Sequence, residues 1–459
     1  MARHAKTDLA KAQPSSFTEP SQRRLTELGL MILAWIVVTS FYVLASLGAH
    51  GHLPPHLGVF LCAIVAISLA MHFAIRWLAP NASQVLLPIA TLLNGIGYVE
   101  IARWNPNDSI PAHQALWFLI SAGGLVVTLR VVRHVRDLDR YRYLTLLGAI
   151  LLLLSPLIPH FGQNINGARL WVIVGPISFQ PVEIAKILLV FFFASYFAAN
   201  RELLSTPTQR IGRRNIVAPK VLLPILFAWG FSIAILGAEN DIGFALLLFA
   251  LFISMLWVTT GLKTYVVLGI GLFGGGAYVA AKFFTQIHSR VTLWLDPWPT
   301  CAHHVSCQIV YGWFSLAAGG ITGTGLGFGQ SGNIPYLTSD MIFAAVGEEL
   351  GFLGVILLLC LFAAFVGEGF RIAQKAHSDF VRLAAAGLSA LMGFQAFFIM
   401  AGVLRLLPFT GITLPFVAYG GSSLFANYLI TALLLRISHE SATERRGGEI
   451  VVVKFDKKT

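Results

Sequence analysis

Charged residues are scarce in this sequence. Only 12% of its 459 residues are Asp, Glu, Lys or Arg, whereas 56% are hydrophobic and the mean hydropathy is +0.74. Soluble domains carry roughly 25% charged residues. The composition therefore excludes a soluble protein and predicts an all-α polytopic membrane protein, because backbone polar groups in lipid must be satisfied within helices.

A cleavable leader is not expected at the start of the sequence either. Residues 1–27 are polar and contain no apolar core followed by a small-residue cleavage site, so they are expected to form a cytosolic tail. The net charge is +11. In so apolar a chain this charge predicts basic loops that face anionic membrane lipids, and no nucleic-acid partner is expected.

Apolar stretches long enough to cross a bilayer recur along the chain, since a crossing helix needs about 20 residues. The basic loops at 130–142 and 200–215 place both termini in the cytosol if there are twelve spans. The loops 159–180 and 285–339 are then extracytoplasmic, and residues 439–459 form a second cytosolic tail. The predicted spans are 28–48, 57–79, 84–103, 114–133, 143–158, 181–199, 221–237, 241–260, 264–284, 340–366, 380–406 and 412–437.

Cysteine is rare, with four residues. Cys62 and Cys360 fall within predicted spans and are expected to be buried core residues. Cys301 and Cys307 lie outside the bilayer, where an oxidising environment and their short spacing favour a disulfide. Two histidines stand between them, so a metal site is a weaker alternative, although the spacing matches no zinc motif.

One acidic residue stands in an unusual setting. Asp296 lies between Trp294 and Trp298 in the sequence LWLDPWP. One interpretation is an interfacial turn, since Trp is common at membrane interfaces and Asp before Pro often starts turns. The other is a general base or acid beside an aromatic surface.

A second polar group opens the sixth span. Glu183 and Lys186 are three residues apart and share one helix face. They are either a mutually neutralising pair or a polar site at the outer face for an anionic ligand. In the second case, Arg169 and Trp171 would lie at its mouth.

Several polar residues stand at the ends of other spans. Asp241 and Asp340 precede apolar runs and are expected to act as helix N-caps, with a ligand role as the alternative for Asp241. Asp340 and Ser422 are also candidate substrate-binding residues. Ser422 could satisfy backbone groups that nearby prolines and glycines leave free. Glu348 and Glu349 lie deeper, where charge is costly, so they must be paired, protonated or facing water. The glycine-rich stretch before them lacks the GK[ST] signature of a P-loop.

Five of these motifs in order resemble the SEDS family, which comprises the RodA, FtsW and SpoVE proteins. They are NGARLW…ISFQPVEIAKI, DIG, LWLDP, GGITGTGLGFG…SDMIFAAVGEELGF and LPFTGITLPFVAYGGSSL, within roughly 84–437. The resemblance implies a ten-helix core over residues 80–438 and an added N-terminal helix pair at 28–79. It is closest to actinobacterial RodA-type members.

The resemblance further implies a peptidoglycan glycosyltransferase in a bacterial cytoplasmic membrane. It would polymerise lipid II at the outer face during elongation and shape maintenance, with a class B penicillin-binding protein as its transpeptidase partner. A division role is not excluded. The family's essential acid corresponds to Asp296, the Trp of its GAxxW motif to Trp171, and the acid and base of its QPxExxK motif to Glu183 and Lys186. The sequence departs from the family pattern at Glu239, at Tyr311 and at the two outer cysteines.

The expected mechanism uses Asp296 as the base that takes the proton of the attacking sugar hydroxyl. Arg169, Lys186, Arg290 and Arg405 are candidate partners of the leaving pyrophosphate. No cofactor is required by the sequence, although Mg²⁺ or Mn²⁺ could accompany the pyrophosphate. The alternatives are a flippase or transporter for lipid-linked precursors and a non-catalytic scaffold.

Overall fold

The chain folds almost entirely into helices. The structure, a computed structural model, describes residues 20–456 apart from positions 55–56, 106–108, 160, 166–167, 175–176, 206–208, 212–213, 217–218, 240, 284 and 303–306. Its long helices are α1 (Pro20–His50), α2 (Leu57–Leu78), α3 (Leu86–Trp104), α4 (Ile110–Val131), α5 (Arg142–Leu154), α6 (Val182–Ala199), α8 (Pro219–Ala238), α9 (Ile242–Thr260), α10 (Lys263–Phe283), α14 (Ile342–Lys375), α15 (Asp379–Val403) and α16 (Gly421–Asp456).

Each of the twelve predicted spans contains one of these helices, so the polytopic all-α prediction is confirmed. Among the described residues, nine helical segments are long and apolar enough to cross a membrane. Their large apolar side chains often point outward, as at Trp77, which is 80% exposed. Such exposure is expected where lipid covers the surface. The last helix begins nine residues later than predicted, because 412–420 is non-helical.

The two segments that were predicted to be outer loops contain helices and strands. Residues 285–339 include α11 (Thr285–Leu295), α12 (Pro297–Ala302), α13 (Gln308–Gly319) and the 3-10 turn η3 (Ser331–Asn333). Residues 159–180 contain an antiparallel sheet of β1 (Gly162–Ile165), β2 (Ala168–Val174) and β3 (Ile177–Phe179). The remaining short elements are η1 (Val135–Tyr141), η2 (Ser155–Leu157), α7 (Arg201–Ser205), β4 (Gln209–Ile211) and β5 (Arg214–Ile216).

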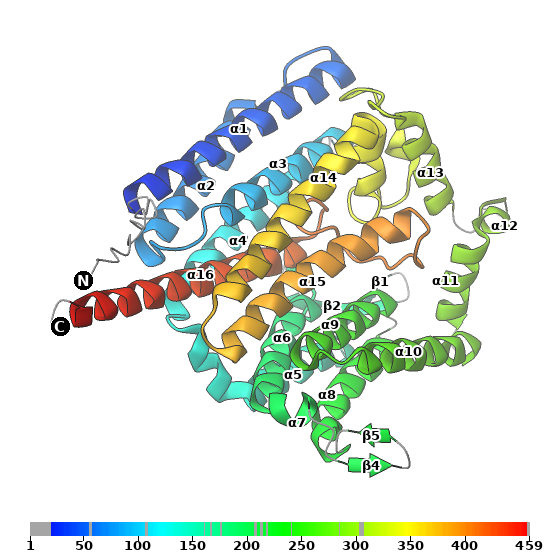
Figure 1. The fold of residues 1–459 in the computed structure, drawn as a ribbon. Coiled ribbons are helices and arrows are strands. Elements are labelled where there is room, and N and C mark those ends of the chain that lie inside the picture. Colours follow the sequence, from blue (N-terminus) through cyan, green and yellow to red (C-terminus); the bar gives the residue numbers. More distant parts are fainter. Residues whose placement is uncertain are drawn as a thin grey trace, which may run out of the picture.

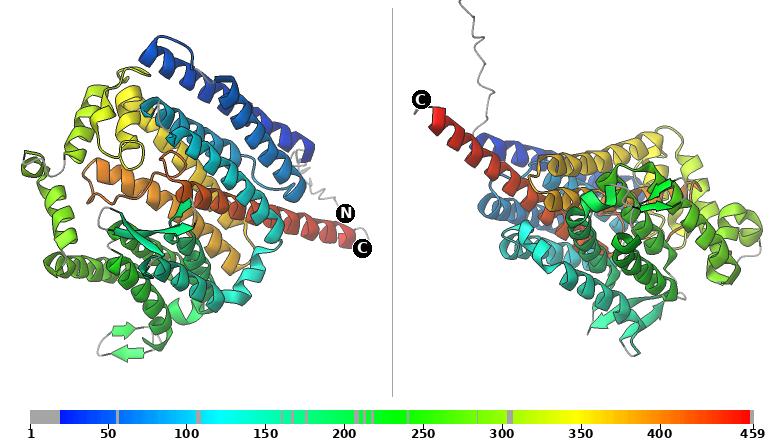
Figure 2. Two further views of the ribbon diagram at one scale, coloured as in Figure 1. Left: turned by 180° about the vertical axis from the view of Figure 1, so that it is seen from behind. Right: turned by 60° about the horizontal axis from the view of Figure 1, so that its bottom comes forward.

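The long helices run side by side with their ends at two opposite sides of the molecule (Figure 1). The first turns of α1 and the last turns of α16 lie at one side, and α11, α12 and α13 follow one another along the opposite edge. The pair α1–α2 covers one flank and packs on α3 and α4. The three-stranded sheet lies against the bundle when the molecule is seen from behind (Figure 2).

Helix α14 is interrupted where the glycine-rich segment 319–333, here called the glycine loop, approaches it. Gly351 has φ 65° and ψ −164°, and a Cβ there would collide with the backbone of the glycine loop. The interruption frees backbone groups that the loop then bonds. Phe352 N donates to Gly320 O at 2.9 Å, and Thr324 N donates to Glu348 O at 2.9 Å. Only glycine tolerates both this φ and this approach.

The carboxylates of Glu348 and Glu349 hold the same loop. Glu349 pairs with Arg103 of α3 at 2.6 Å and accepts from Gly327 N at 3.0 Å. Glu348 accepts from Gln330 N at 2.9 Å and from the Ser331 hydroxyl. Of the three alternatives predicted for these acids, which were paired, protonated or facing water, the structure shows the first. Neither carboxylate is free to bind a transported ligand.

We expect the Arg103–Glu349 pair to be a stability determinant. Glu349→Gln should lower the free energy of unfolding by about 3 kcal/mol, because it leaves a buried guanidinium without its counter-charge. Arg371→Ala, which breaks an exposed pair with Glu368, should cost less than about 1 kcal/mol. Thermal unfolding in detergent measures both, and equal losses would contradict the assignment. The double change of Arg103 and Glu349 to Met should recover part of the loss.

Candidate active site

A buried polar cluster lies at the start of α6. Lys186 Nζ is 2.5 Å from a carboxylate oxygen of Glu183, and both side chains are 0% exposed. The same ammonium donates to Gln395 Oε1 of α15 at 2.6 Å. Gln395 in turn donates through Nε2 to Thr413 O at 3.0 Å. The cluster therefore connects α6, α15 and the non-helical segment before α16, and in this conformation Lys186 is covered on all sides.

Ser422 fastens the beginning of α16 to the same place. Its hydroxyl oxygen accepts from Gln180 N at 2.9 Å, directly before α6, and the side chain is 1% exposed. This is the backbone-satisfying role that the glycine and proline content suggested. In the described structure Ser422 thus supports the first turn of α6, which carries Glu183 and Lys186.

Arg290 of α11 lies between acidic residues from two other parts of the chain. Its Nη1 donates to Thr410 O at 3.1 Å. Its positive charge acts on Asp241, in the turn before α9, and on Asp340, just before α14. Asp241 caps α9 as predicted, because its Oδ1 accepts from Phe244 N at 3.0 Å. The N-cap prediction for Asp340 is wrong, since α14 begins after Met341 and has no side-chain cap.

Three buried acids near the ends of helices have raised pKa values. Burial raises the pKa of Asp340 to about 7, against the opposing effects of the Ser339 hydroxyl and Arg290. Burial likewise raises the pKa of Asp241 to about 6, opposed by the hydrogen bond from Phe244 N and by Arg290. The pKa of Glu239 is raised to about 9 by burial first and by the charge of Asp241 second. Perturbed acids in one region are typical of functional sites.

Asp296 is placed differently from these acids. It stands between α11 and α12, and its side chain is exposed. The flanking backbone is fixed to the end of α15, because Arg405 Nε donates to Trp294 O at 2.7 Å and Trp294 Nε1 donates back to Arg405 O at 3.1 Å. Trp298 packs edge-on against Trp313 at 6.0 Å. Both flanking tryptophans therefore brace the turn, and the carboxylate faces outward.

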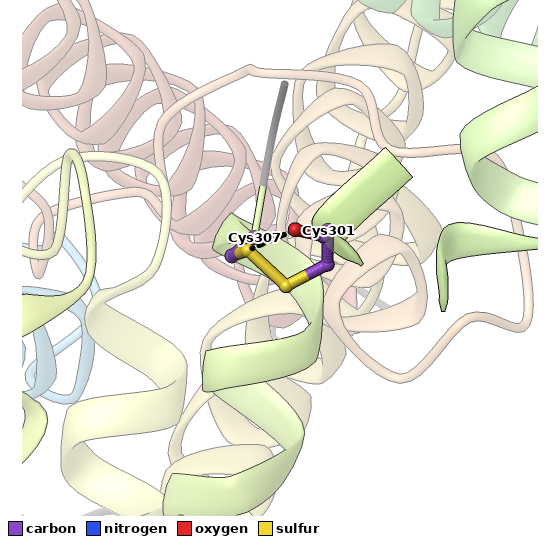
Figure 3. Close-up of a disulfide and its surroundings, with 2 residues drawn as sticks. All are labelled: Cys301 and Cys307. Carbon is purple, nitrogen blue, oxygen red and sulfur yellow. Dashed lines mark hydrogen bonds between the residues drawn. A yellow bond between two sulfur atoms is a disulfide. The ribbon is translucent and has the colours of Figure 1, made fainter. Parts of the chain in front are cut away.

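A disulfide closes the segment that follows Asp296. Cys301 in α12 and Cys307 at the start of α13 are joined, as the sequence favoured (Figure 3). The two histidines between them lie outside the described residues. Cys62 and Cys360 are free and exposed on α2 and α14, so the prediction that they are core residues is wrong. They sit on helix faces that lipid would cover.

Arg169 and Trp171 lie on β2. Arg169 is exposed, and its backbone N donates to Glu239 O at 3.2 Å, which attaches the sheet to the turn between α8 and α9. Trp171 is half-buried and pairs with Gln163 of β1. The backbone thus connects β2 to the turn that contains Glu239 and Asp241.

The structure brings Arg290, Asp241 and Asp340 together and joins Glu183 with Lys186. Arg290 and Asp296 are both on the α11 segment, which runs along residues 405–410.

Sequence reasoning missed Gln395, the partner of Lys186, because a glutamine inside an apolar helix looks like an isolated polar residue. It also left Arg405 as a candidate phosphate contact, whereas its guanidinium bonds the backbone beside Asp296.

Comparison with known proteins places this arrangement in a family. The model of the cell cycle protein family of FtsW, RodA and SpoVE matches residues 82–443. The chain belongs to the FtsW/RodA/SpoVE family. The family match begins after α2, so both α1 and α2 lie outside it.

Individual members of the FtsW/RodA/SpoVE family are similar over most of their length. The peptidoglycan glycosyltransferase RodA of Mycobacterium tuberculosis H37Rv is 36% identical over 93% of both chains. That of Mycobacterium leprae is 36% identical over 91% of both. A solved chain of a peptidoglycan synthase complex is 25% identical with a TM-score of 0.61, and covers 78% of this chain and 97% of its own. RodA of Thermus thermophilus shares the fold, with a TM-score of 0.54, 24% identity and coverage of 79% and 98%.

The raised acid pKa values predict a pH dependence of stability. A carboxyl whose folded pKa lies above its unfolded value binds more protons when folded, so stability falls as pH rises between the two values. For Asp340 this window runs from the ordinary value of 3.8 to about 7. We expect the melting temperature to fall between pH 5 and pH 8, and to fall less in Asp340→Asn. The exposed Asp379→Asn is the control, and it should keep the wild-type slope.

The disulfide predicts a local effect of reduction. A reductant, or the change Cys301→Ser, should increase protease cleavage between α11 and α13 and lower the activity of the enzyme. The helical content should stay the same, because the bridge closes a short loop at the edge of the bundle. Circular dichroism and limited proteolysis measure the two effects. Cys62→Ser is the matched control, and unchanged cleavage and activity after reduction would contradict this role.

Proposed function

We propose that the protein is a peptidoglycan glycosyltransferase that polymerises lipid II at the extracytoplasmic face of a bacterial cytoplasmic membrane. The observation that carries the proposal is the 36% identity over 93% of the chain to proteins named peptidoglycan glycosyltransferase RodA. The site supports it with an outward-facing carboxylate, Asp296, on the same helical segment as a half-buried guanidinium, Arg290.

In the proposed reaction, a sugar hydroxyl of one lipid-linked unit attacks the anomeric carbon of another. A new C–O bond forms, and the bond from that carbon to the pyrophosphate oxygen breaks. The Asp296 carboxylate takes the hydroxyl proton, for which its exposed position is suited. The backbone directly before Asp296 is held by the Arg405 guanidinium, which donates to Trp294 O and Leu295 O, and Trp294 Nε1 donates in return to Arg405 O.

The leaving pyrophosphate needs positive charge. Arg290 is the best placed of the four cationic candidates, because its guanidinium is half-buried and has hydrogen-bonding capacity beyond its contact with Thr410 O. Arg169 is exposed on β2 and can approach a ligand from the sheet. Lys186 is fully buried, so we assign it to positioning α6 and to raising the local positive potential. Arg405 is assigned to bracing the turn.

A divalent cation is proposed as a companion of the pyrophosphate. Among the described residues no group of three or more His, Cys, Asp or Glu side chains is arranged to hold a metal ion. Both carboxylate oxygens of Glu239 and one of Asp241 nevertheless lack a hydrogen-bond partner. Mg²⁺ commonly binds one or two carboxylates together with substrate phosphates. Glu239 and Asp241 fit such shared binding, in which the cation would neutralise phosphate charge.

We further propose a class B penicillin-binding protein as partner, both termini in the cytosol, and the site on the outer side. The similar solved chain comes from a complex described as coordinating polymerisation and crosslinking. The start of α1 and the end of α16 lie opposite α11–α13 (Figure 1), which is consistent with this topology. A role in elongation fits the RodA relatives.

A transporter is less well supported, because Glu348 and Glu349 are bound to the glycine loop.

Replacement of Asp296 tests the reaction directly. Asp296→Ala and Asp296→Asn should each lower polymerisation of lipid II by at least about 100-fold, the usual contribution of a positioned base. The folded fraction should stay unchanged, because the side chain is exposed. The measurement is gel separation of glycan products formed by purified protein in detergent, with and without the partner.

The exposed Asp379, at the start of α15, provides the control, and Asp379→Ala should polymerise at the wild-type rate. Detergent leaves no second compartment, so a protein that only moved lipid-linked precursors would yield no polymer. Full polymerisation by either Asp296 variant would refute the assigned base. Absence of polymer from wild type with its partner would refute the enzyme itself.

A further inference from the structure

A large cavity lies between the N-terminal helix pair and the family core. It has a volume of about 820 Å³ and is lined by residues of α1, α2, α3 and α4. The lining residues lie at one side of the molecule. They come from the end of α1 and the segment after it (42–54), and from the parts of α2, α3 and α4 between 59 and 67, 94 and 103, and 111 and 118. The cavity is therefore confined to one half of the membrane thickness. It is the half next to the glycine loop, which Arg103 contacts.

The lining is mostly apolar and aromatic. Tyr42 and Phe60 have ring centroids 4.6 Å apart, and Phe60 stacks on Tyr98 at 4.9 Å, which makes one aromatic wall from α1, α2 and α3. Ile64, Ile67 and other aliphatic residues line the remainder. Such a cavity is of the size that binds ligands and is suited to hydrocarbon chains. It is not a site for a free polar metabolite.

One buried amide indicates that the ligand is not purely hydrocarbon. Gln114 of α4 lines the cavity and is 1% exposed, and neither Oε1 nor Nε2 of its side chain has a hydrogen-bond partner. A buried polar group without a partner costs about 1–3 kcal/mol. Because Gln114 lines the cavity, a rotation of its side chain would bring the amide to a ligand there. A ligand with ester oxygens or a hydroxyl near its acyl chains would satisfy it.

Cationic and titratable groups stand at the cavity's end near the glycine loop. Arg103 uses Nε for Glu349 and Nη2 for Gly327 O and Gly329 O, and its Nη1 takes part in none of these bonds. His50 and His52 stack at 5.6 Å and also line the cavity. These donors can bind phosphate oxygens. Polar donors at one end and an apolar interior match the two parts of an amphiphile.

We propose that this cavity is a binding site for a glycerophospholipid of the membrane half that faces the glycine loop. The phosphate meets Arg103, His50 and His52. The glycerol ester region meets the Gln114 amide, and an acyl chain lies along the wall of Tyr42 and Phe60. The site belongs to the junction with α1 and α2, outside the family match, and its occupant is distinct from the glycan-forming substrate.

A lipid bound in the cavity would also affect the glycine loop. A Cβ at Gly48 would collide with Leu326 O, and one at Gly327 would collide with Ala45 O, so the last turns of α1 touch the loop backbone directly. Arg103 contacts both the cavity and the loop. A lipid that holds α1 against α3 therefore also stabilises the loop that precedes Asp340.

The experiment uses the full chain in nanodiscs that contain a phosphatidylglycerol analogue with a diazirine in its acyl chain. After irradiation, mass spectrometry maps the labelled peptides. We expect label on 42–67 and 94–118 above the level on other lipid-facing helices. Ala63→Trp places an indole in the cavity and should lower this label by about tenfold, since a filled core space excludes other atoms.

Two further variants make the result specific. Ala66→Trp, on the exposed face of the same helix and outside the lining, should leave the label within about twofold of wild type, because it leaves the cavity open. Gln114→Leu keeps the shape of the side chain and should lower the label about fivefold, the equivalent of one hydrogen bond. Folding of each variant is checked by its melting temperature.

The outcomes separate this proposal from the enzymatic one. Label spread evenly over lipid-facing helices, or label unaffected by Ala63→Trp while Ala66→Trp behaves as wild type, would overturn the lipid site. Displacement of the label by stoichiometric lipid II would also overturn it, since the cavity would then be a substrate site. Labelling needs no turnover, so an inactive protein that still labels at the cavity would refute only the proposed reaction.

Discussion

The ion pair between Arg103 and Glu349 is the interaction on which the end of the bundle that carries the glycine loop depends. Within a bilayer a carboxylate must be paired, and here its partner comes from a helix 246 residues earlier in the chain. The same two side chains bind the backbone of the glycine loop. That loop leads to Thr338, whose carbonyl accepts from Tyr419 N at 2.8 Å. The segment before α16 is thereby fixed, and it supplies Thr410 O to Arg290.

The charged side chains of the candidate site differ in how deeply they are buried. Glu183 and Lys186 are sealed among α6, α15 and the segment before α16, where they fix the geometry of these elements. Arg290 is half-buried beside acids whose pKa values burial raises. Asp296 is exposed at the edge. Such a difference in burial allows a structural ion pair and the proposed solvent-facing base to coexist, because only the exposed group would have to exchange protons with a substrate.

Prediction from sequence succeeded where one physical rule applies to every residue of a segment. Long apolar runs must be helices in lipid, so all twelve predicted spans contain helices. Prediction failed where a neighbour far along the chain decides. Asp340 is no N-cap, because the turn from Tyr336 continues past it and delays α14. The prediction that Cys62 and Cys360 are core residues failed, because helix composition alone does not show which face lipid covers. Both side chains are exposed.

The sequence by itself determined the membrane class and the family motifs, and it predicted that Asp296, Lys186, Cys301 and Cys307 lie at the outer face. These follow from composition and short-range patterns. Only the tertiary structure decided that Gln395 accepts a hydrogen bond from Lys186, that Arg405 braces the Asp296 turn, and that a cavity lies between one end of the α1–α2 pair and the core. The reason is physical: burial, pairing and empty space depend on packing between helices, which no local pattern encodes.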